Sequence, residues 1–288
     1  MRFEKWQALG NDYLIVEHDG LPWELTPGRV RRLCDPHFGV GSDGILLLSE
    51  AREDRYVAEL RIFNPDGSEA ELSGNGARQA VLYLRHRGWT DRDEFAILTP
   101  AGDVRPTISD RKTVSMDIGR AAVTSPDYPG GPSDGGGTVT SDGREWRFQH
   151  VNVGNPQCVI QVGDEVEKLD LAAIGPEIER SPLFPNRTNV SFIRVDPGDA
   201  RAQGSTVRAR IFERGVGETL ASGTGASGAA VVAHLRGARS PITVRLDGGD
   251  LLVEVSSELD VRLTGSAEPV YSGELSAELL EALESIRD

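Results

Sequence analysis

The chain has 288 residues, enough for one large domain or two domains of roughly 100–150 residues, and its 38% apolar residues and 33 glycines indicate a globular, turn-rich protein. A net charge of −14 argues against a nucleic-acid or anionic-membrane partner, because either requires a basic surface. Only two cysteines occur, Cys34 and Cys158, so we expect two isolated buried or half-buried thiols and neither a disulfide framework nor a cysteine-rich metal site. These features favour a cytoplasmic protein.

The N-terminal segment, MRFEKWQALGNDYLIVE, has no apolar signal core and is typical of a strand that enters the fold. No stretch of the chain approaches the roughly 20 apolar residues of a membrane span. The Gly10-Asn11 turn after this strand has a counterpart at Gly154-Asn155, which is the first sign of internal duplication.

A gapless repeat lies further along the chain. Residues 61–77, RIFNPDGSEAELSGNGA, and residues 210–226, RIFERGVGETLASGTGA, are identical at eight of seventeen positions. Each copy predicts a strand, a loop carrying Ser-Gly-x-Gly-Ala, and a helix. We expect these helices to stop at Arg87-Gly88 and Arg236-Gly237, with glycine in the left-handed conformation that ends helices.

The correspondence continues downstream. Residues 95–104 match 242–251 as strand, turn and strand, and residues 114–121 match 261–267. We therefore expect an N-terminal half at 1–121, joined by the C-terminal segment 265–288, and a C-terminal half at 122–264. The turn-rich segment 125–143 is either a linker between the halves or a long hairpin loop.

The predicted fold class is α+β. The second repeat helix, GASGAAVVAHL, is nearly apolar all round and should be enclosed, whereas the first is only partly so. The simplest architecture has two pseudo-symmetric halves, each a mixed β-sheet wrapped around a central helix, with the active site in the cleft between them.

The Ser-Gly-x-Gly-Ala loops present backbone N–H groups at a helix N-terminus, where the helix dipole favours an anion. An ordinary serine cap with a tight glycine turn is the alternative for either copy alone. Two related copies would present two serines and two anion-binding ends to one substrate, as inversion at a carbon requires. Four asparagines at turn-like strand ends fit either turns or amino-acid binding: Asn11, Asn64, Asn155 and Asn189.

Other chemistries have weaker support. Residues 223–228 satisfy the G-x-G-x-x-G dinucleotide pattern and Asp247 follows, but ten residues separate the glycines from the preceding strand. The five histidines show no metal-ligand spacing, and none of the three lysines has the setting of a pyridoxal-phosphate enzyme. We expect no metal and no cofactor.

A family resemblance joins these motifs. LGNDYLIVE, HFGVGSDGILLL, FNPDGSEAELSGNGAR, NVGNPQCV, RTNVSF and ERGVGETLASGTGAS resemble, in the same order, the motif set of the diaminopimelate epimerase family. The resemblance implies a pyridoxal-phosphate-independent isomerase of lysine and peptidoglycan precursor synthesis. Such an enzyme interconverts LL- and meso-2,6-diaminopimelate by two-base proton transfer at the α-carbon. Each of its chains has two pseudo-symmetric halves, and it is usually a homodimer.

The resemblance also implies site residues. Family members carry a catalytic cysteine at the start of each loop, and the matching positions here are Ser73 and Ser222. The glycine-rich helix ends would hold the reacting carboxylate, and the asparagines with the Glu-Arg pair would hold the distal amino-acid end. The implied substrate contacts are Asn11, Asn64, Gly74, Asn75, Asn155, Asn189, Glu213, Arg214, Gly223 and Thr224.

The departures from the family affect the chemistry. A serine hydroxyl has a far higher pKa than a thiol and needs an adjacent base, yet the family's NPH histidine is Gln157 and its frequent GADQ glutamine is Gly44. Deliberate replacement of both cysteines, a natural variant with different chemistry and a non-catalytic relative all fit the two serines. The alternative functions are a racemase or isomerase of another amino acid and a catalytically silent amino-acid-binding protein.

Overall fold

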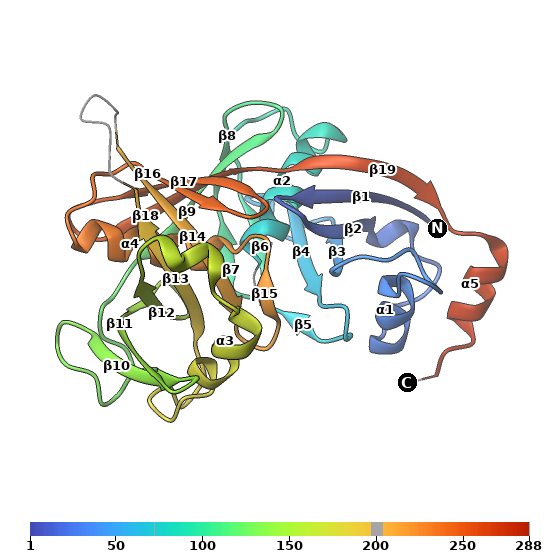
Figure 1. Cartoon of the computed structure of the whole chain (residues 1–288). Helices are drawn as coiled ribbons and strands as arrows, with labels where there is room; N and C mark the ends of the chain where they lie inside the picture. Colours follow the sequence, from blue (N-terminus) through green and yellow to red (C-terminus); the bar gives the residue numbers. More distant parts are fainter. Residues whose placement is uncertain (72, 197–203, 288) are drawn as a thin grey trace. The chain divides into compact units, whose positions relative to one another are not determined.

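A computed structural model describes residues 1–71, 73–196 and 204–287 (Figure 1). The chain forms two compact units. Unit 1 comprises Met1–Met116 and Gly265–Asp288, and unit 2 comprises Asp117–Thr264. The repeat alone suggested a first boundary after residue 121, whereas the compact units change over at 116/117, within a strand. No helix among the described residues is both long and apolar enough to cross a membrane.

Unit 1 is built on one mixed sheet. The order of its strands is β19-β1-β2-β3-β4-β6-β7, with β5 paired to β4. The elements are β1 (Arg2–Ala8), β2 (Asn11–Glu17), η1 (His18–Gly20), α1 (Pro27–Cys34), β3 (Ile45–Ser49), β4 (Ala58–Phe63), β5 (Glu69–Ala70), α2 (Gly74–His86), β6 (Ile97–Thr99), β7 (Gly102–Val104), β8 (Pro106–Ile108), β9 (Thr113–Arg120), β19 (Glu268–Glu274) and α5 (Ala277–Glu284).

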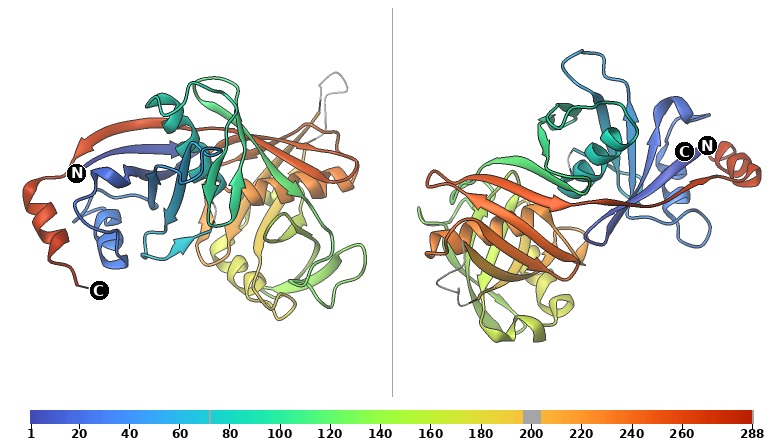
Figure 2. Two further views of the ribbon diagram at one scale, coloured as in Figure 1. Left: turned by 180° about the vertical axis from the view of Figure 1, so that it is seen from behind. Right: turned by 90° about the horizontal axis from the view of Figure 1, so that it is seen from above.

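Both faces of this sheet are covered. Strand β3 is a continuous apolar run in which Leu46 and Leu48 join the core under α2, while Ile45 and Leu47 join the core that contains residues of α1 and α5. A strand buried on both faces is expected to lack polar alternation. In Figure 2, β19 runs beside β1, and both chain termini lie at the α1–α5 end of the unit.

Unit 2 is also built around a mixed sheet. The strand order of this sheet is β10-β11-β12-β13-β14-β16-β17-β18-β9-β8, with β15 paired to β14. Strand β9 contains the boundary between the units, and β8 pairs with it. The elements are β10 (Gly136–Ser141), β11 (Arg144–Asn152), β12 (Pro156–Gln161), η2 (Asp164–Lys168), α3 (Leu171–Glu179), β13 (Asn189–Val195), β14 (Ser205–Glu213), β15 (Gly217–Thr219), α4 (Gly223–Leu235), β16 (Ile242–Leu246), β17 (Gly249–Val255) and β18 (Asp260–Ser266).

The two units repeat the same strand pairing. In unit 1, neighbouring strands from β1 to β7 pair antiparallel, parallel, antiparallel, parallel and antiparallel. In unit 2, the strands from β11 to β17 pair in the same sequence. Each repeat copy is a strand, a loop with a short strand, and a helix, as predicted. The predicted α+β class with two halves is confirmed.

An ion pair encoded by the repeat recurs in both units. Arg61 on β4 donates to Glu69 on β5 at 2.8 Å, and Arg210 on β14 donates to Glu218 on β15 at 2.9 Å. In each copy of the repeat, this arginine–glutamate pair links the repeat strand to the short strand that precedes the helix.

The predicted helix ends are also confirmed. Gly88 and Gly237 follow the C-caps of α2 and α4 with φ values of 77° and 97°, in the left-handed region that glycine enters without a steric penalty.

Two expectations need correction. Segment 125–143 is not a linker, because it lies within unit 2 and its second part forms β10. Tyr128 is buried there against Phe148 and Phe184, with ring centroids 5.3 and 5.5 Å away. Helix α2 is also as enclosed as α4, since Arg78 and Gln79 are fully buried. The alternation of polar and apolar residues in α2 predicts a helix with one face at the surface. The polar residues are instead buried, and hydrogen bonds make their burial possible.

Candidate functional site

Ser73 and Ser222 are the N-caps of α2 and α4 in nearly identical geometry. Their φ and ψ angles are −132° and 121° for Ser73 and −137° and 121° for Ser222. Each hydroxyl oxygen accepts a hydrogen bond from the backbone N–H of the third residue of its helix, which is Gly76 at 3.1 Å in α2 and Gly225 at 3.2 Å in α4. Both side-chain oxygens thus lie at the positive end of a helix dipole, which stabilises negative charge.

Glycine at the start of each helix permits close packing on the sheet. A β-carbon at Gly225 would lie 2.6 Å from the Ile211 side chain, and one at Gly76 would lie 3.0 Å from Leu46. Gly74, one residue after the first cap, has no atom within 4 Å of such a carbon. The helix ends are therefore tight against the sheet and open at the first residue of α2, where a ligand can approach the backbone.

In unit 2 the capping serine is joined to a carboxylate. Ser222, which is 2% exposed, donates to Glu213 Oε2 at 2.8 Å, and Thr219 donates to Glu213 Oε1 at 2.7 Å. Burial raises the pKa of Glu213, although the hydrogen bonds from Thr219 and Ser222 oppose the rise. A carboxylate with a raised pKa is a stronger base, so it can accept the serine proton more readily.

In unit 1 the capping serine has different partners. The Tyr13 hydroxyl donates to Ser73 Oγ at 3.4 Å. The repeat position of Glu213 is occupied by Asn64, whose amide donates to Ser68 within its own turn at 3.0 Å. Sequence reasoning missed both Tyr13 and the contact between Glu213 and Ser222. The break in the repeat at Glu213 was a signal, whereas nothing in the pattern indicated Tyr13.

An asparagine of each Gly-Asn turn contacts the first turn of the repeat helix. In unit 1, Asn75 Nδ2 donates to Asn11 Oδ1 at 3.2 Å. In unit 2, Asn155 Nδ2 donates to Thr224 Oγ1 at 3.2 Å. In each unit, the asparagine of the turn is far in sequence from the helix residue that it contacts, by 64 residues in unit 1 and 69 in unit 2. The two turns thus lie at equivalent positions beside the capping serines.

Asn189, the first residue of β13, contacts Arg214, the residue that follows β14. Asn189 is buried, donates to Pro156 O at 3.2 Å and accepts from the Arg214 backbone N–H at 2.9 Å. The exposed Arg214 side chain donates to Asn186 O at 3.0 Å. In this structure the Asn189 amide positions the loop that follows β14.

The candidate residues therefore form two local groups, one in each unit. In unit 1 they are Asn11, Asn64, Ser73, Gly74 and Asn75, and in unit 2 they are Asn155, Asn189, Glu213, Arg214, Ser222, Gly223 and Thr224. That the two groups face a shared cleft stays a prediction.

The structure shows what occupies the two positions at which this chain departs from the family motifs, Gly44 and Gln157. Gly44 has a φ of 155°, and a β-carbon there would lie 2.3 Å from Phe63 O, so no side chain fits at this position without a shift of the backbone. Gln157 is fully buried and donates to Asn155 Oδ1 at 2.6 Å. It orients the Asn155 amide toward Thr224 but supplies no base.

The cysteines do not replace the missing thiols. Cys34 and Cys158 are both buried, as expected, and burial raises the pKa of each thiol. Among residues 1–71, 73–196 and 204–287, no group of three or more His, Cys, Asp or Glu side chains is arranged to hold a metal ion.

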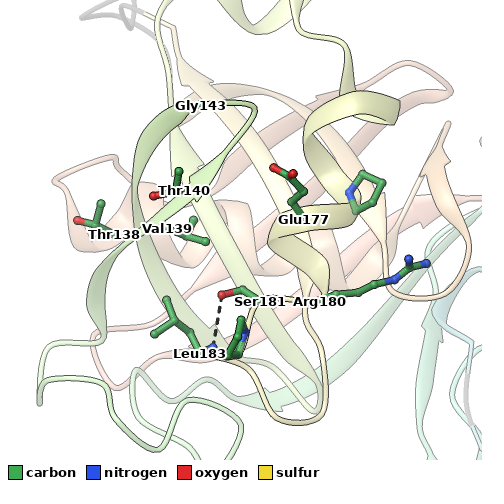
Figure 3. Close-up of a pocket in the computed structure, with 10 residues that line it drawn as sticks. Thr138, Val139, Thr140, Gly143, Glu177, Arg180, Ser181 and Leu183 are labelled. Carbon is green, nitrogen blue, oxygen red and sulfur yellow. Dashed lines mark hydrogen bonds between the residues drawn. The ribbon is translucent and has the colours of Figure 1, made fainter.

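A pocket of about 730 Å³ lies elsewhere in unit 2, between β10 and α3 (Figure 3). Thr138 and Thr140 line one side, and Glu177 and Arg180 line the other. The Glu177 carboxylate already accepts from the Asp142 backbone N–H at 2.8 Å. Because the pocket contains none of the candidate residues, size alone does not identify the site.

Solved structures of low sequence identity share this fold. A probable proline racemase from Agrobacterium radiobacter K84 matches with a TM-score of 0.67 at 18% identity, over 96% of this chain and 93% of that chain. A phenazine biosynthesis protein of the PhzF family from Bacillus anthracis matches with a TM-score of 0.67 at 18% identity, over 96% and 99%. The fold of this chain is thus shared with a probable proline racemase and a phenazine biosynthesis protein.

Sequence comparisons identify the family. The diaminopimelate epimerase family model matches residues 3–124 and 149–270. Diaminopimelate epimerase 2 of Nostoc sp. is 40% identical, over 99% of both chains, and diaminopimelate epimerase of Desulfitobacterium hafniense is 38% identical, over 97% of this chain and 100% of that protein. The chain therefore belongs to the diaminopimelate epimerase family, and it is an isomerase of the amino-acid epimerase type.

Proposed function

We propose that this protein binds 2,6-diaminopimelate and inverts one α-carbon by transferring protons through Ser73 and Ser222. The hydrogen bond from Ser222 to Glu213 carries this proposal, because it gives one serine the adjacent base that its high pKa demands. Membership of the family and the names of the relatives support the substrate.

Anion binding at the two helix ends supports the choice of an α-carbon as the reacting atom. Removal of an α-proton places negative charge on the carbon and its carboxylate. The free N–H groups and the dipole of a helix N-terminus stabilise such charge, and both capping serines lie at such an end. Apart from Glu213, the remaining candidate side chains are amides, one guanidinium and one hydroxyl, which suit an ammonium and carboxylates.

The proton balance in one direction is as follows. Glu213 accepts the Ser222 proton while the Ser222 oxygen removes the α-proton of the substrate, and the Ser73 hydroxyl delivers its proton to the opposite face. Ser73 is then an alkoxide, which the N-terminus of α2 stabilises until solvent reprotonates it. The opposite inversion reverses these transfers.

This chemistry is expected to be slow. Glu213 can assist Ser222, but the side chain that contacts the Ser73 oxygen is the Tyr13 hydroxyl, and a phenol is not a base at neutral pH. General acid–base catalysis contributes about 10²–10⁴-fold per group, and both protons depend on it. We therefore expect binding of diaminopimelate with turnover several orders of magnitude below that of a cysteine-bearing active site.

Calorimetry and hydrogen exchange test the proposal together. Titration with meso-diaminopimelate should give saturable binding, and incubation in deuterated water should exchange the α-proton slowly but above the rate without protein. Binding without any exchange would leave an amino-acid-binding protein rather than an enzyme. If diaminopimelate does not bind but another amino acid does, the assigned substrate is wrong.

We also propose that the protein is a cytoplasmic homodimer. Strand β19 lies at the edge of the unit 1 sheet and exposes Val270 (54%) and Tyr271 (45%), so a second copy could cover this apolar edge. Analytical ultracentrifugation of the parent and of Tyr271→Glu would test it. A parent that sediments as a monomer contradicts the proposal.

A further inference from the structure

Arg78 is a fully buried cation directly behind the start of α2. Its guanidinium turns back toward the first turn, where Nη2 donates to Asn75 Oδ1 at 2.6 Å and Nη1 to Gly74 O at 3.3 Å. Its Nε has no hydrogen-bond partner, and within the described part of the chain no carboxylate forms an ion pair with it. Among the described residues, the hydrogen-bond acceptors of this charge are thus two neutral oxygens, Asn75 Oδ1 and Gly74 O.

Such an arrangement is costly in a folded protein. Burial lowers the pKa of Arg78 to about 10, so the side chain remains protonated at neutral pH. A buried charge without a counter-charge destabilises the fold, and replacing buried ionic groups by apolar ones is often neutral or stabilising. Packing and stability alone do not explain why an arginine occupies this position.

The second copy of the repeat shows that the backbone does not need the charge. Ser227 occupies the position equivalent to Arg78, one turn into α4, and is also fully buried. Its hydroxyl donates to Gly223 O at 2.9 Å, the carbonyl equivalent to Gly74 O. A neutral hydroxyl thus satisfies the same helix turn, and the positive charge of Arg78 is an addition specific to unit 1.

The charge also sets the direction of a chain of amides. Because Arg78 occupies Asn75 Oδ1, the Asn75 amide nitrogen must point away, and it donates to Asn11 Oδ1. Asn11 Nδ2 in turn donates to Asp43 Oδ2 at 3.0 Å. With a donor-only cation at one end and an acceptor-only carboxylate at the other, neither asparagine can flip without losing both of its bonds.

We propose that Arg78 is a positioning residue that makes the start of α2 the stronger anion-binding end, by holding Asn75 in one orientation and adding positive charge behind the backbone N–H groups. The anion that it favours is the carboxylate of the bound amino acid, together with the charge that develops when the α-proton leaves. This inference rests on the proposed function and adds to it which of the two helix ends bears the larger negative charge.

Three variants test the role of the charge in ligand binding. Arg78→Met removes the charge at similar length, Arg78→Lys keeps it, and Ser227→Ala is the matched control in unit 2. We expect Arg78→Met to melt at or above the temperature of the parent, but to bind meso-diaminopimelate about 10–100-fold more weakly, a scale typical of outer positioning groups. Arg78→Lys should recover part of the affinity, and Ser227→Ala should retain parental affinity.

A second readout needs no substrate. A thiol placed by Ser73→Cys reports the potential at the cap, and its pKa follows from the pH dependence of its alkylation by iodoacetamide, since both native cysteines are buried. Adding Arg78→Met should raise this pKa by roughly one unit, the lower end of the effect of a nearby charge. An unchanged thiol pKa together with unchanged affinity overturns the inference. If the parent binds no diaminopimelate but the thiol pKa shifts, the proposed substrate fails and the role of Arg78 stands.

Discussion

In unit 1, the serine that caps α2 accepts a hydrogen bond from Tyr13, and a buried guanidinium lies behind the helix end. In unit 2, the serine that caps α4 donates to the carboxylate of Glu213, and the position equivalent to Arg78 is a neutral serine. The backbone of the two ends is nearly the same, yet their charges are opposite. The duplicated backbone supplies two anion-binding caps, and the residues that depart from the repeat make one cap electropositive and the other basic.

The amide chains beside the caps also run in opposite directions. In unit 1, donors lead away from the helix, from Arg78 through Asn75 to Asn11. In unit 2, they lead toward the helix, from Gln157 through Asn155 to Thr224. An isomerase that handles two mirror-related configurations therefore has two unlike ends, and the difference predicts unequal effects of matched substitutions.

Introducing thiols at the two caps should have the largest effect. Ser73→Cys with Ser222→Cys is expected to raise α-proton exchange and epimerisation by several orders of magnitude, since each general acid–base group contributes about 10²–10⁴-fold and a thiolate is accessible near neutral pH. Each single change should accelerate exchange from one configuration more than inversion, because only one face then has an effective base. Proton NMR in deuterated water measures both rates, with Ser68→Cys as the control.

If the parent is already fast and the double cysteine variant is no faster, the serines belong to another mechanism. Equal acceleration of exchange and inversion by each single change would contradict the assignment of one face to each residue.

Removing the base of unit 2 is the next largest effect. Glu213→Gln should lower α-proton exchange about 10²-fold. The rate of the parent should rise with pH through the raised pKa of Glu213, and this dependence should be absent from the variant. Glu218→Gln is the matched control, because Glu218 lies on the neighbouring strand and pairs with Arg210. A parental rate in Glu213→Gln would exclude Glu213 as the base.

The same residue should make stability depend on pH. Because burial raises the pKa of Glu213, the folded state binds its proton more tightly than the unfolded state. Stability from this group is greatest below the ordinary carboxyl pKa and declines as pH rises through the raised value. The melting temperature of Glu213→Gln relative to the parent should therefore be more favourable at pH 8 than at pH 4.5, and an unchanged difference would contradict the raised pKa.

Glycine replacements should separate a closely packed glycine from an open one by stability. Gly225→Ala forces a methyl group toward Ile211 and should destabilise unit 2 by about 1–3 kcal/mol. Gly74→Ala meets no atom within 4 Å and should be neutral or stabilise by up to about 1 kcal/mol, since alanine favours helix. Urea denaturation measures both. Equal costs at the two sites would show that Gly225 is not more closely packed than Gly74.

The repeated ion pair gives the smallest contrast. Arg61 is half-exposed, so Arg61→Ala should cost about 1 kcal/mol or less. Arg210 is mostly buried and also donates to Val166 O and Leu169 O at 3.0 and 2.8 Å, so Arg210→Ala should cost about 1–3 kcal/mol. Thermal melts in low and high salt separate these effects, because salt weakens the exposed pair more. A larger loss of stability in Arg61→Ala than in Arg210→Ala would contradict this prediction.

Local patterns were enough to predict much of this protein. The Ser-Gly-x-Gly-Ala motif indicated both serine caps, and the Arg-Gly pairs indicated both helix ends, because capping and left-handed glycine depend on residues within one turn of the chain. The gapless spacing of 61–77 and 210–226 indicated the duplicated strand–loop–helix unit for the same reason. The order of the motifs indicated the family.

The tertiary structure decided which charges lie beside the caps. Glu213 reaches Ser222 only because β14 and β15 pair before α4 begins, so the sequence alone placed it with the distal substrate contacts. The helix that carries Arg78 was expected to be only partly enclosed, and the full enclosure of α2 makes Arg78 a buried cation. Such contacts depend on sheet register and on how a helix packs across it, and hydrophobic periodicity records neither. The sequence therefore determined the duplicated scaffold, and packing between distant segments determined how its two halves differ.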